Sequence, residues 1–124
     1  MIITNDFMNR FLWTLGMTES KNNDEAWGDK NDNGYQAMGR WQVHPSWLWT
    51  WSRTCNIQPT LVDSWDSFVE RVLENFVRYH SELNAHEIAM TFHLGHIVRE
   101  GAPEWDIAYY DRFIAMWAIY DKTL

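Results

Sequence analysis

The chain has little cysteine, few basic residues and no long hydrophobic run. Because Cys55 is its only cysteine, an intramolecular disulfide is excluded and the fold must be stabilised by its apolar core. Asp6 and Arg10 interrupt the apolar stretch near the N-terminus, which excludes a signal-peptide hydrophobic region and a membrane-spanning helix there. We therefore expect a protein that is made in the cytoplasm without a signal peptide and does not insert into membranes.

The shortage of positive charge excludes one class of partner. Ten Lys and Arg residues stand against 17 Asp and Glu residues, which gives a formal net charge of −7 at pH 7. Binding to nucleic acid requires clustered Lys and Arg that neutralise phosphates, so nucleic acid is not an expected ligand. The length of 124 residues and the 46% hydrophobic content predict one folded domain spanning residues 1–124.

Tryptophan, in contrast, is abundant. The chain has nine tryptophans, against roughly one or two per hundred residues in average proteins. Trp65 and Trp117 lie on apolar helical stripes and are expected in the core. Trp47, Trp49 and Trp51 alternate along one predicted helix, so they cannot all face inward, and one or two should be exposed.

The hydrophobic periodicity predicts a mainly helical fold. Residues 5–16 have helical spacing, and a helix with Pro45 in its first turn follows later. Residues 19–43 lose this period, and Asn33-Gly34 is a typical hairpin turn. We therefore expect an irregular loop with a small β element after the first helix.

Capping motifs mark the remaining helices. Thr60-x-x-Asp63 and Asn84-x-x-Glu87 approximate capping boxes, and the second of these helices is expected to end by Gly101. A last helix begins near Asp106. The predicted fold class is mainly α (α+β), with about five to six helices.

Glu19 is the first candidate for chemistry. It is expected just past the first helix, where the chain turns into the polar loop. A carboxyl group packed against apolar surface has a raised pKa and can donate a proton near neutral pH. The alternative is a solvated glutamate at a helix end.

Two short motifs add to this hypothesis. Glu19-Ser20 precedes the segment Gly39-Arg40-Trp41-Gln42-Val43-His44-Pro45, and Ala89-Met90-Thr91-Phe92-His93-Leu94-Gly95 follows, with Tyr109-Tyr110 near the last helix. This pattern resembles the goose-type lysozyme and lytic transglycosylase family, which belongs to the lysozyme-like superfamily. The family has a Glu-Ser pair, a Gly-x-x-Gln-(Ile/Val)-x-Pro run and an Ala-Tyr-Asn-Ala-Gly segment. The chain departs from the family at Phe92 and His93.

The resemblance implies cleavage of peptidoglycan. Glu19 would protonate the β-1,4 glycosidic oxygen between N-acetylmuramic acid and N-acetylglucosamine. Water activated by a second carboxylate would then give hydrolysis, whereas the sugar 6-hydroxyl would give an anhydro product. Asp29 is the preferred second carboxylate among the four acids of the loop, because hydrolytic members of the family place an aspartate there; the alternative is that all four are solvated.

The same resemblance, together with the suitability of flat aromatic rings for sugar stacking, suggests substrate-binding residues. Gln42 and Tyr110 would contact the sugar or orient Glu19, although Gln42 could instead brace the backbone and Tyr110 could belong to the core. The other expected contacts are Ser20, Trp27, Tyr35, Trp41 and His93. His93-x-x-His96 lacks a third ligand at a recognisable spacing, so we expect no metal and no cofactor.

Two other hypotheses remain open. A lysozyme-like fold could serve as a non-catalytic module that binds a glycan or a protein, which the changes at Phe92 and His93 favour. An exposed tryptophan patch at residues 47–51 could bind a partner. The small size and absent signal fit a bacteriophage or phage-associated protein that acts at the bacterial cell wall or in the periplasm. The sequence does not indicate an oligomeric state.

Overall fold

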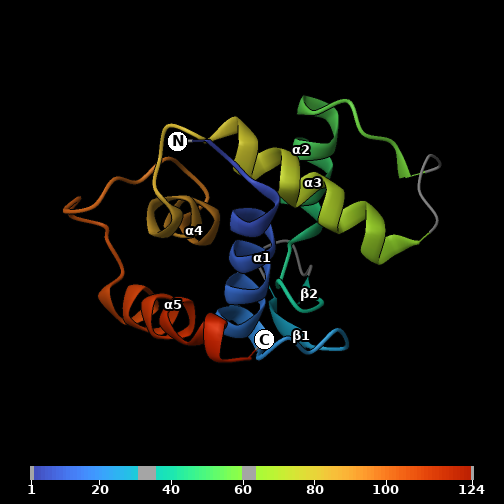
Figure 1. Cartoon of the computed structure of the whole chain (residues 1–124). Coiled ribbons are helices and arrows are strands. Elements are labelled where there is room, and N and C mark those ends of the chain that lie inside the picture. The colour runs from blue at the N-terminus through green and yellow to red at the C-terminus, as the bar shows by residue number, and fades with distance from the viewer. Residues whose placement is uncertain (1, 31–35, 60–63, 124) are drawn as a thin grey trace.

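The computed structural model describes residues 2–30, 36–59 and 64–123 and has a mainly helical fold with a small β element, as predicted. Figure 1 shows α1 running through the middle, with α4 and α5 on one side and the sheet, α2 and α3 on the other. The elements are α1 (Asn5–Ser20), β1 (Trp27–Lys30), β2 (Gln36–Met38), α2 (Pro45–Thr54), α3 (Trp65–Tyr79), α4 (Ala85–Leu94), α5 (Ile107–Ile119) and the 3₁₀ helix η2 (Tyr120–Thr123).

Helix α1 is one turn longer than predicted. Thr4 caps its N-terminus by accepting a hydrogen bond from the Phe7 amide at 3.0 Å, and Lys21 ends it in the left-handed conformation. Gly16, expected near the end, lies inside the helix. The Asn22 side chain packs against it, and a Cβ at Gly16 would lie 1.8 Å from Asn22 Oδ1. Glu19 therefore lies in the last turn of α1, not past its end.

The predicted hairpin is present as an antiparallel pair of short strands. Trp27 pairs with Met38, and Lys30 pairs with Gln36. The Asn33-Gly34 turn itself lies outside the described residues. A second tight turn follows, in which the Met38 and Val43 amides each donate to the other's carbonyl at 3.1 Å. Gly39 has a φ of 80° in this turn, a conformation that glycine adopts without strain.

Capping explains where the remaining helices begin. Pro45 occupies the first turn of α2, and the Asn84–Glu87 capping box of α4 is formed as predicted. The expected cap at Thr60–Asp63 lies outside the described residues; α3 begins at Trp65, with Ser64 as its cap. Helix α4 ends at Leu94, earlier than predicted, because Gly95 adopts a φ of 83°. Asp106 caps α5, which begins near this residue as predicted.

The core is rich in aromatic rings. Its largest fully buried side chains are Tyr109, Phe11, Phe68, Phe76 and Phe113. Each fully buried phenylalanine contributes about 1.5–3 kcal/mol relative to an exposed one. Trp117 packs against this core, but Trp65, which was predicted to be buried, is 45% exposed because it lies in the first turn of α3.

The alternation of the α2 tryptophans is confirmed. Trp47 and Trp51 pack edge-on against Phe76, at ring distances of 5.4 and 4.9 Å. Trp49 is 44% exposed. Among the described residues, no helix is both long and apolar enough to span a membrane.

Candidate active site: the groove beside Glu19

A groove with a volume of about 510 Å³ opens beside the C-terminal end of α1. Its walls come from α1, β2, the start of α2 and the end of α4, four segments that are distant in sequence. The described lining residues are Glu19, Ala37, Gln42, His44, Ser46, Trp47, Phe92, His93, Leu94 and Gly95. Glu19 is the only carboxyl group among them.

Glu19 is held in this groove by a tyrosine. The phenol of Tyr109 donates a hydrogen bond of 2.6 Å to Glu19 Oε2. Burial raises the pKa of the Glu19 carboxyl, and this effect exceeds the lowering by the Tyr109 hydrogen bond and by the nearby His93 and Arg112. Burial also raises the pKa of Tyr109 well above its ordinary value, so its hydroxyl remains a donor. Glu19 thus has the environment of a general acid.

Both the ring and the backbone of Tyr109 are held in place. The His93 ring stacks on the Tyr109 ring with centroids 3.9 Å apart and an angle of 7° between the planes. Asp106 accepts one hydrogen bond from the Tyr109 amide at 3.1 Å and lies 3.0 Å from His93 Nε2. The N-terminal cap of α5 therefore holds both the ring stack and the residue that contacts Glu19.

Gln42 forms another part of the groove wall and braces the backbone. It has a φ of 52°, and its Nε2 donates to the Gly39 carbonyl at 2.9 Å and to the Ala26 carbonyl at 3.3 Å. Gly28 is required beside it, because a Cβ there would lie 2.1 Å from Gln42 Oε1. Gln42 thus joins the tight turn to the segment leading into β1 and still faces the groove.

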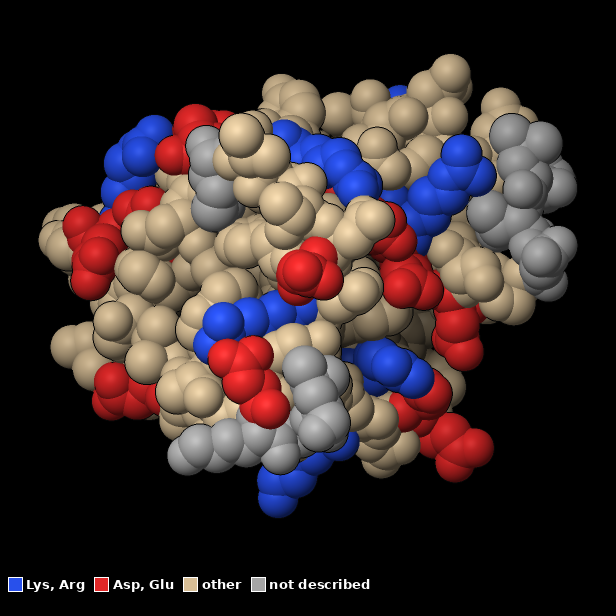
Figure 2. Space-filling model, viewed as in Figure 1, with Lys and Arg blue, Asp and Glu red and all other residues tan. Residues whose placement is uncertain are grey.

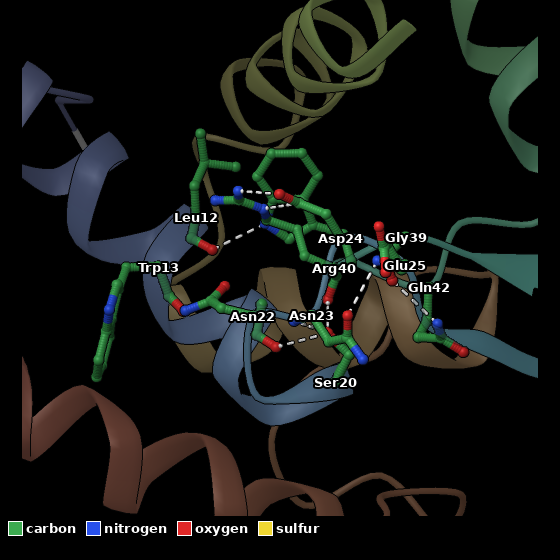
Figure 3. A network of polar contacts seen from close by, with 12 residues as sticks. Leu12, Trp13, Ser20, Asn22, Asn23, Asp24, Glu25, Gly39, Arg40 and Gln42 are labelled. Atoms are coloured by element: carbon green, nitrogen blue, oxygen red, sulfur yellow. Dashed lines mark hydrogen bonds and ion pairs between the residues drawn. The ribbon is translucent and has the colours of Figure 1, made fainter.

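Ser20 holds the end of α1 to the same turn. Its hydroxyl donates to the Arg40 carbonyl at 2.7 Å and accepts from the Asn23 amide at 3.0 Å. Figure 3 shows this network, in which Arg40 also pairs with Asp24. Ser20 was expected to contact substrate, but its hydroxyl is used by these backbone groups. These bonds tie the last turn of α1, which carries Glu19, to the turn that contains Arg40.

Two aromatic residues lie elsewhere than expected. Trp41, a predicted sugar-stacking residue, is only 8% exposed, because its indole N–H donates to the Leu12 carbonyl at 2.8 Å inside the core. Tyr110, predicted to contact the sugar or to orient Glu19, faces away from the groove and contacts the rings of His86 and Trp105. The neighbouring Tyr109 occupies the position expected for Tyr110.

The other predicted site residues lie in the groove, at a different cavity or outside the described part of the structure. His93 and Gln42 line the groove, as expected for cleft residues. Trp27 is 69% exposed and lines a different cavity, described below. Tyr35 and the side chain of Asp29 lie outside the described part of the structure.

The histidines of this region pair with acids. His86 lies 3.2 Å from Glu100, His93 lies 3.0 Å from Asp106, and His96 lies 3.3 Å from Glu104. These pairs join α4 and the residues that follow it to the segment leading into α5. Within the described ranges, no group of three or more His, Cys, Asp or Glu side chains could hold a metal ion.

Tyr109 and Asp106 are the site residues that the sequence pattern missed. Tyr109 and Phe113 are four residues apart and share the buried face of α5, whereas Tyr110 was the residue expected at the site. Asp106 was expected only to mark the start of the last helix.

Charged side chains are mixed on the face of the molecule shown in Figure 2, which has no continuous basic surface. Comparisons with family models, with curated proteins and with solved structures find no match to this chain. Function is therefore inferred from the groove, its acid and the sequence motifs.

Proposed function

We propose that this protein is a peptidoglycan-cleaving glycosidase, a lysozyme or lytic transglycosylase that acts at the bacterial cell wall. The observation that carries the proposal is the half-buried Glu19 carboxyl, which has a raised pKa, accepts a hydrogen bond from Tyr109 and faces an open groove. The Glu19-Ser20 and Gly39-x-x-Gln42 motifs support the same assignment. A bacteriophage origin fits the small size of the chain.

Proton donation is the first step. Tyr109 occupies Oε2 of Glu19, so the transferable proton is carried on Oε1. Transfer of this proton to the β-1,4 glycosidic oxygen breaks the bond to C1 of N-acetylmuramic acid, and the N-acetylglucosamine leaves with a free 4-hydroxyl. The Glu19 carboxylate that results accepts a stronger hydrogen bond from Tyr109, because the acceptor is now charged.

The glycosyl cation is then captured by an oxygen nucleophile. If the 6-hydroxyl of the same sugar attacks C1, its proton returns to Glu19 and a 1,6-anhydro ring closes. If water attacks, a second carboxylate takes the proton and the product has a reducing end. Asp29 stays the proposed base for the hydrolytic route, as the family resemblance implies, and Asp24 and Glu25 line the other cavity.

Digestion of purified peptidoglycan by wild type, Glu19→Gln and Glu25→Gln tests the proposal. Glu19→Gln preserves shape and removes the proton, and we expect it to lose about 10²-fold to 10⁴-fold in the rate of fragment release. Glu25→Gln, a matched change of an exposed loop acid, should release fragments at the wild-type rate. Mass spectrometry of the fragments separates anhydro ends from reducing ends.

One result would contradict the glycosidase proposal. If wild type is folded, as judged by circular dichroism and thermal unfolding, but releases no fragments, the glycosidase assignment is wrong. Sedimentation of the protein with insoluble peptidoglycan would then identify a non-catalytic glycan-binding module.

A further inference from the structure

A second cavity lies on the other side of β2 from the Glu19 groove. Its volume is about 570 Å³, and it is lined by residues 24–27, residues 38–41, Val43 and the start of α3. Ala37 lines the groove, whereas the next residue, Met38, lines this second cavity. The two cavities therefore occupy opposite faces of one short strand.

Two exposed indole rings line the second cavity. Trp27 on β1 is 69% exposed, and Trp65 in the first turn of α3 is 45% exposed. Trp65 packs on Phe68 with a ring distance of 5.5 Å. The described ring contacts do not join Trp27 to Trp65, and both residues line the cavity. Open tryptophan surface around a cavity is typical of a ligand site.

The charge at the cavity is negative. Asp24, Glu25 and Asp66 line it together with a single basic residue, Arg40, so the carboxylates are in excess by two. Arg40 Nη2 donates to Asp24 Oδ2 at 2.8 Å, and this hydrogen bond lowers the pKa of Asp24. Among the described residues, Glu25 and Asp66 form no ion pair.

Arg40 is a cation that the protein itself already places against an indole ring and a carboxylate. The Arg40 guanidinium lies over the Trp41 ring, 5.3 Å from the centroid, while Asp24 neutralises its charge. An indole face with a nearby carboxylate is a favourable environment for an organic cation, because the ring quadrupole and the carboxylate both attract positive charge. Trp27 and Trp65 offer the same combination with Glu25 and with Asp66, which also attracts Arg40 without forming an ion pair with it.

We propose that the second cavity binds an organic cation, a quaternary or alkyl ammonium group, between Trp27 and Trp65, with Glu25 and Asp66 as counter-charges. The excess of carboxylates disfavours an anionic ligand. A neutral sugar could stack on the indoles but would make no use of this charge. The site is separate from the Glu19 groove and does not depend on the proposed glycosidase activity.

Titration with choline and with its neutral isostere 3,3-dimethyl-1-butanol tests the charge requirement directly. The indole N–H signals in ¹H–¹⁵N spectra report binding at each tryptophan, and the spectra of Trp27→Ala and Trp65→Ala identify the two relevant signals. We expect choline, but not the isostere, to shift those two signals in a saturable manner. The Glu25→Gln/Asp66→Asn variant should bind choline about fivefold or more weakly, as should each tryptophan variant.

Two controls keep the result specific. Trp49→Ala removes a ring of similar exposure that does not line the cavity, and it should bind choline as wild type does. Glu19→Gln should also bind normally, so loss of glycosidase activity and loss of this site are distinguishable. The proposal is overturned if choline and the isostere bind equally, or if choline gives no saturable shift in the folded protein. It is also overturned if neutral chitotriose alone binds through Trp27 and Trp65, which would make this a saccharide site.

Discussion

Tyr109 and Glu19 are 90 residues apart in the chain, and their side chains are joined by a hydrogen bond of 2.6 Å. The bond links the first turn of α5 to the last turn of α1, and these two helices pack against each other, with α5 on one side of the central α1 (Figure 1). The orientation of the candidate acid is therefore set by helix packing and not by a surface loop.

Tyr109→Phe tests this link. The substitution keeps the ring that stacks on His93 and removes the donor to Glu19, which leaves Glu19 Oε2 without that partner. We expect kcat for peptidoglycan cleavage to fall about tenfold or more, with KM little changed, because one to three kcal/mol is a typical penalty for an unsatisfied polar group. In wild type the Tyr109 hydrogen bond lowers the pKa of Glu19, so its removal raises that pKa. The alkaline limb of the kcat profile should therefore move to higher pH.

Tyr110→Phe is the matched control for that experiment. Tyr110 is adjacent in sequence but contacts His86 and Trp105, and its ring is retained in the variant. The pH profile and the rate of peptidoglycan cleavage by Tyr110→Phe should match those of wild type. Equal losses in both variants would show that the phenol of Tyr109 has no specific role.

Glu19→Gln should change how the stability of the protein depends on pH. The folded-state pKa of Glu19 is raised, chiefly by burial, so its contribution to stability is greatest below the unfolded pKa and is lost as pH rises through the folded pKa. Above its folded-state pKa the ionised wild-type carboxyl is destabilising, and in that pH range Glu19→Gln should melt at a higher temperature than wild type. The gap should close as pH falls to the ordinary glutamate range, which thermal unfolding at a series of pH values measures. A constant gap at every pH would contradict the expected coupling.

Gly28→Ala should disturb the groove through Gln42. The new methyl would lie 2.1 Å from Gln42 Oε1, so the amide must leave the carbonyls of Gly39 and Ala26 or the strand must shift. We expect a loss of about 1–3 kcal/mol in the free energy of unfolding, as for other overpacked sites. Denaturant unfolding of the single and double variants provides the check: in a Gln42→Ala background, Gly28→Ala should be less destabilising. Additive losses would show that the two residues do not clash.

Local patterns predicted much of the fold, because caps and helical stripes depend on neighbours in sequence. The Asn84–Glu87 box, the Asp106 cap and the strands around Asn33-Gly34 follow from such rules. Gly16 misled the prediction of the end of α1, because the glycine is there to accommodate Asn22 and does not end the helix.

The site was predicted less completely, because its geometry depends on contacts between distant segments. Glu19, Gln42 and His93 were recognised and share one groove. Trp41 was expected to stack on a sugar because a flat aromatic ring suits that contact, yet its N–H donates to the Leu12 carbonyl within the core. Choosing correctly between Tyr109 and Tyr110 requires the rotation of α5 about its own axis relative to α1. The sequence does not specify this rotation to within one residue.

The turn between Met38 and Val43 has a consequence for how this chain can change during evolution. Met38 faces the second cavity, while Gln42 faces the groove, and the paired amides at the two ends fix the number of residues between them. Inserting or deleting one residue here would break the Met38–Val43 pairing and change where Gln42 points relative to Met38. The length of this segment is therefore constrained, and homologues that keep both cavities should preserve the spacing from Gly39 to Gln42 without gaps.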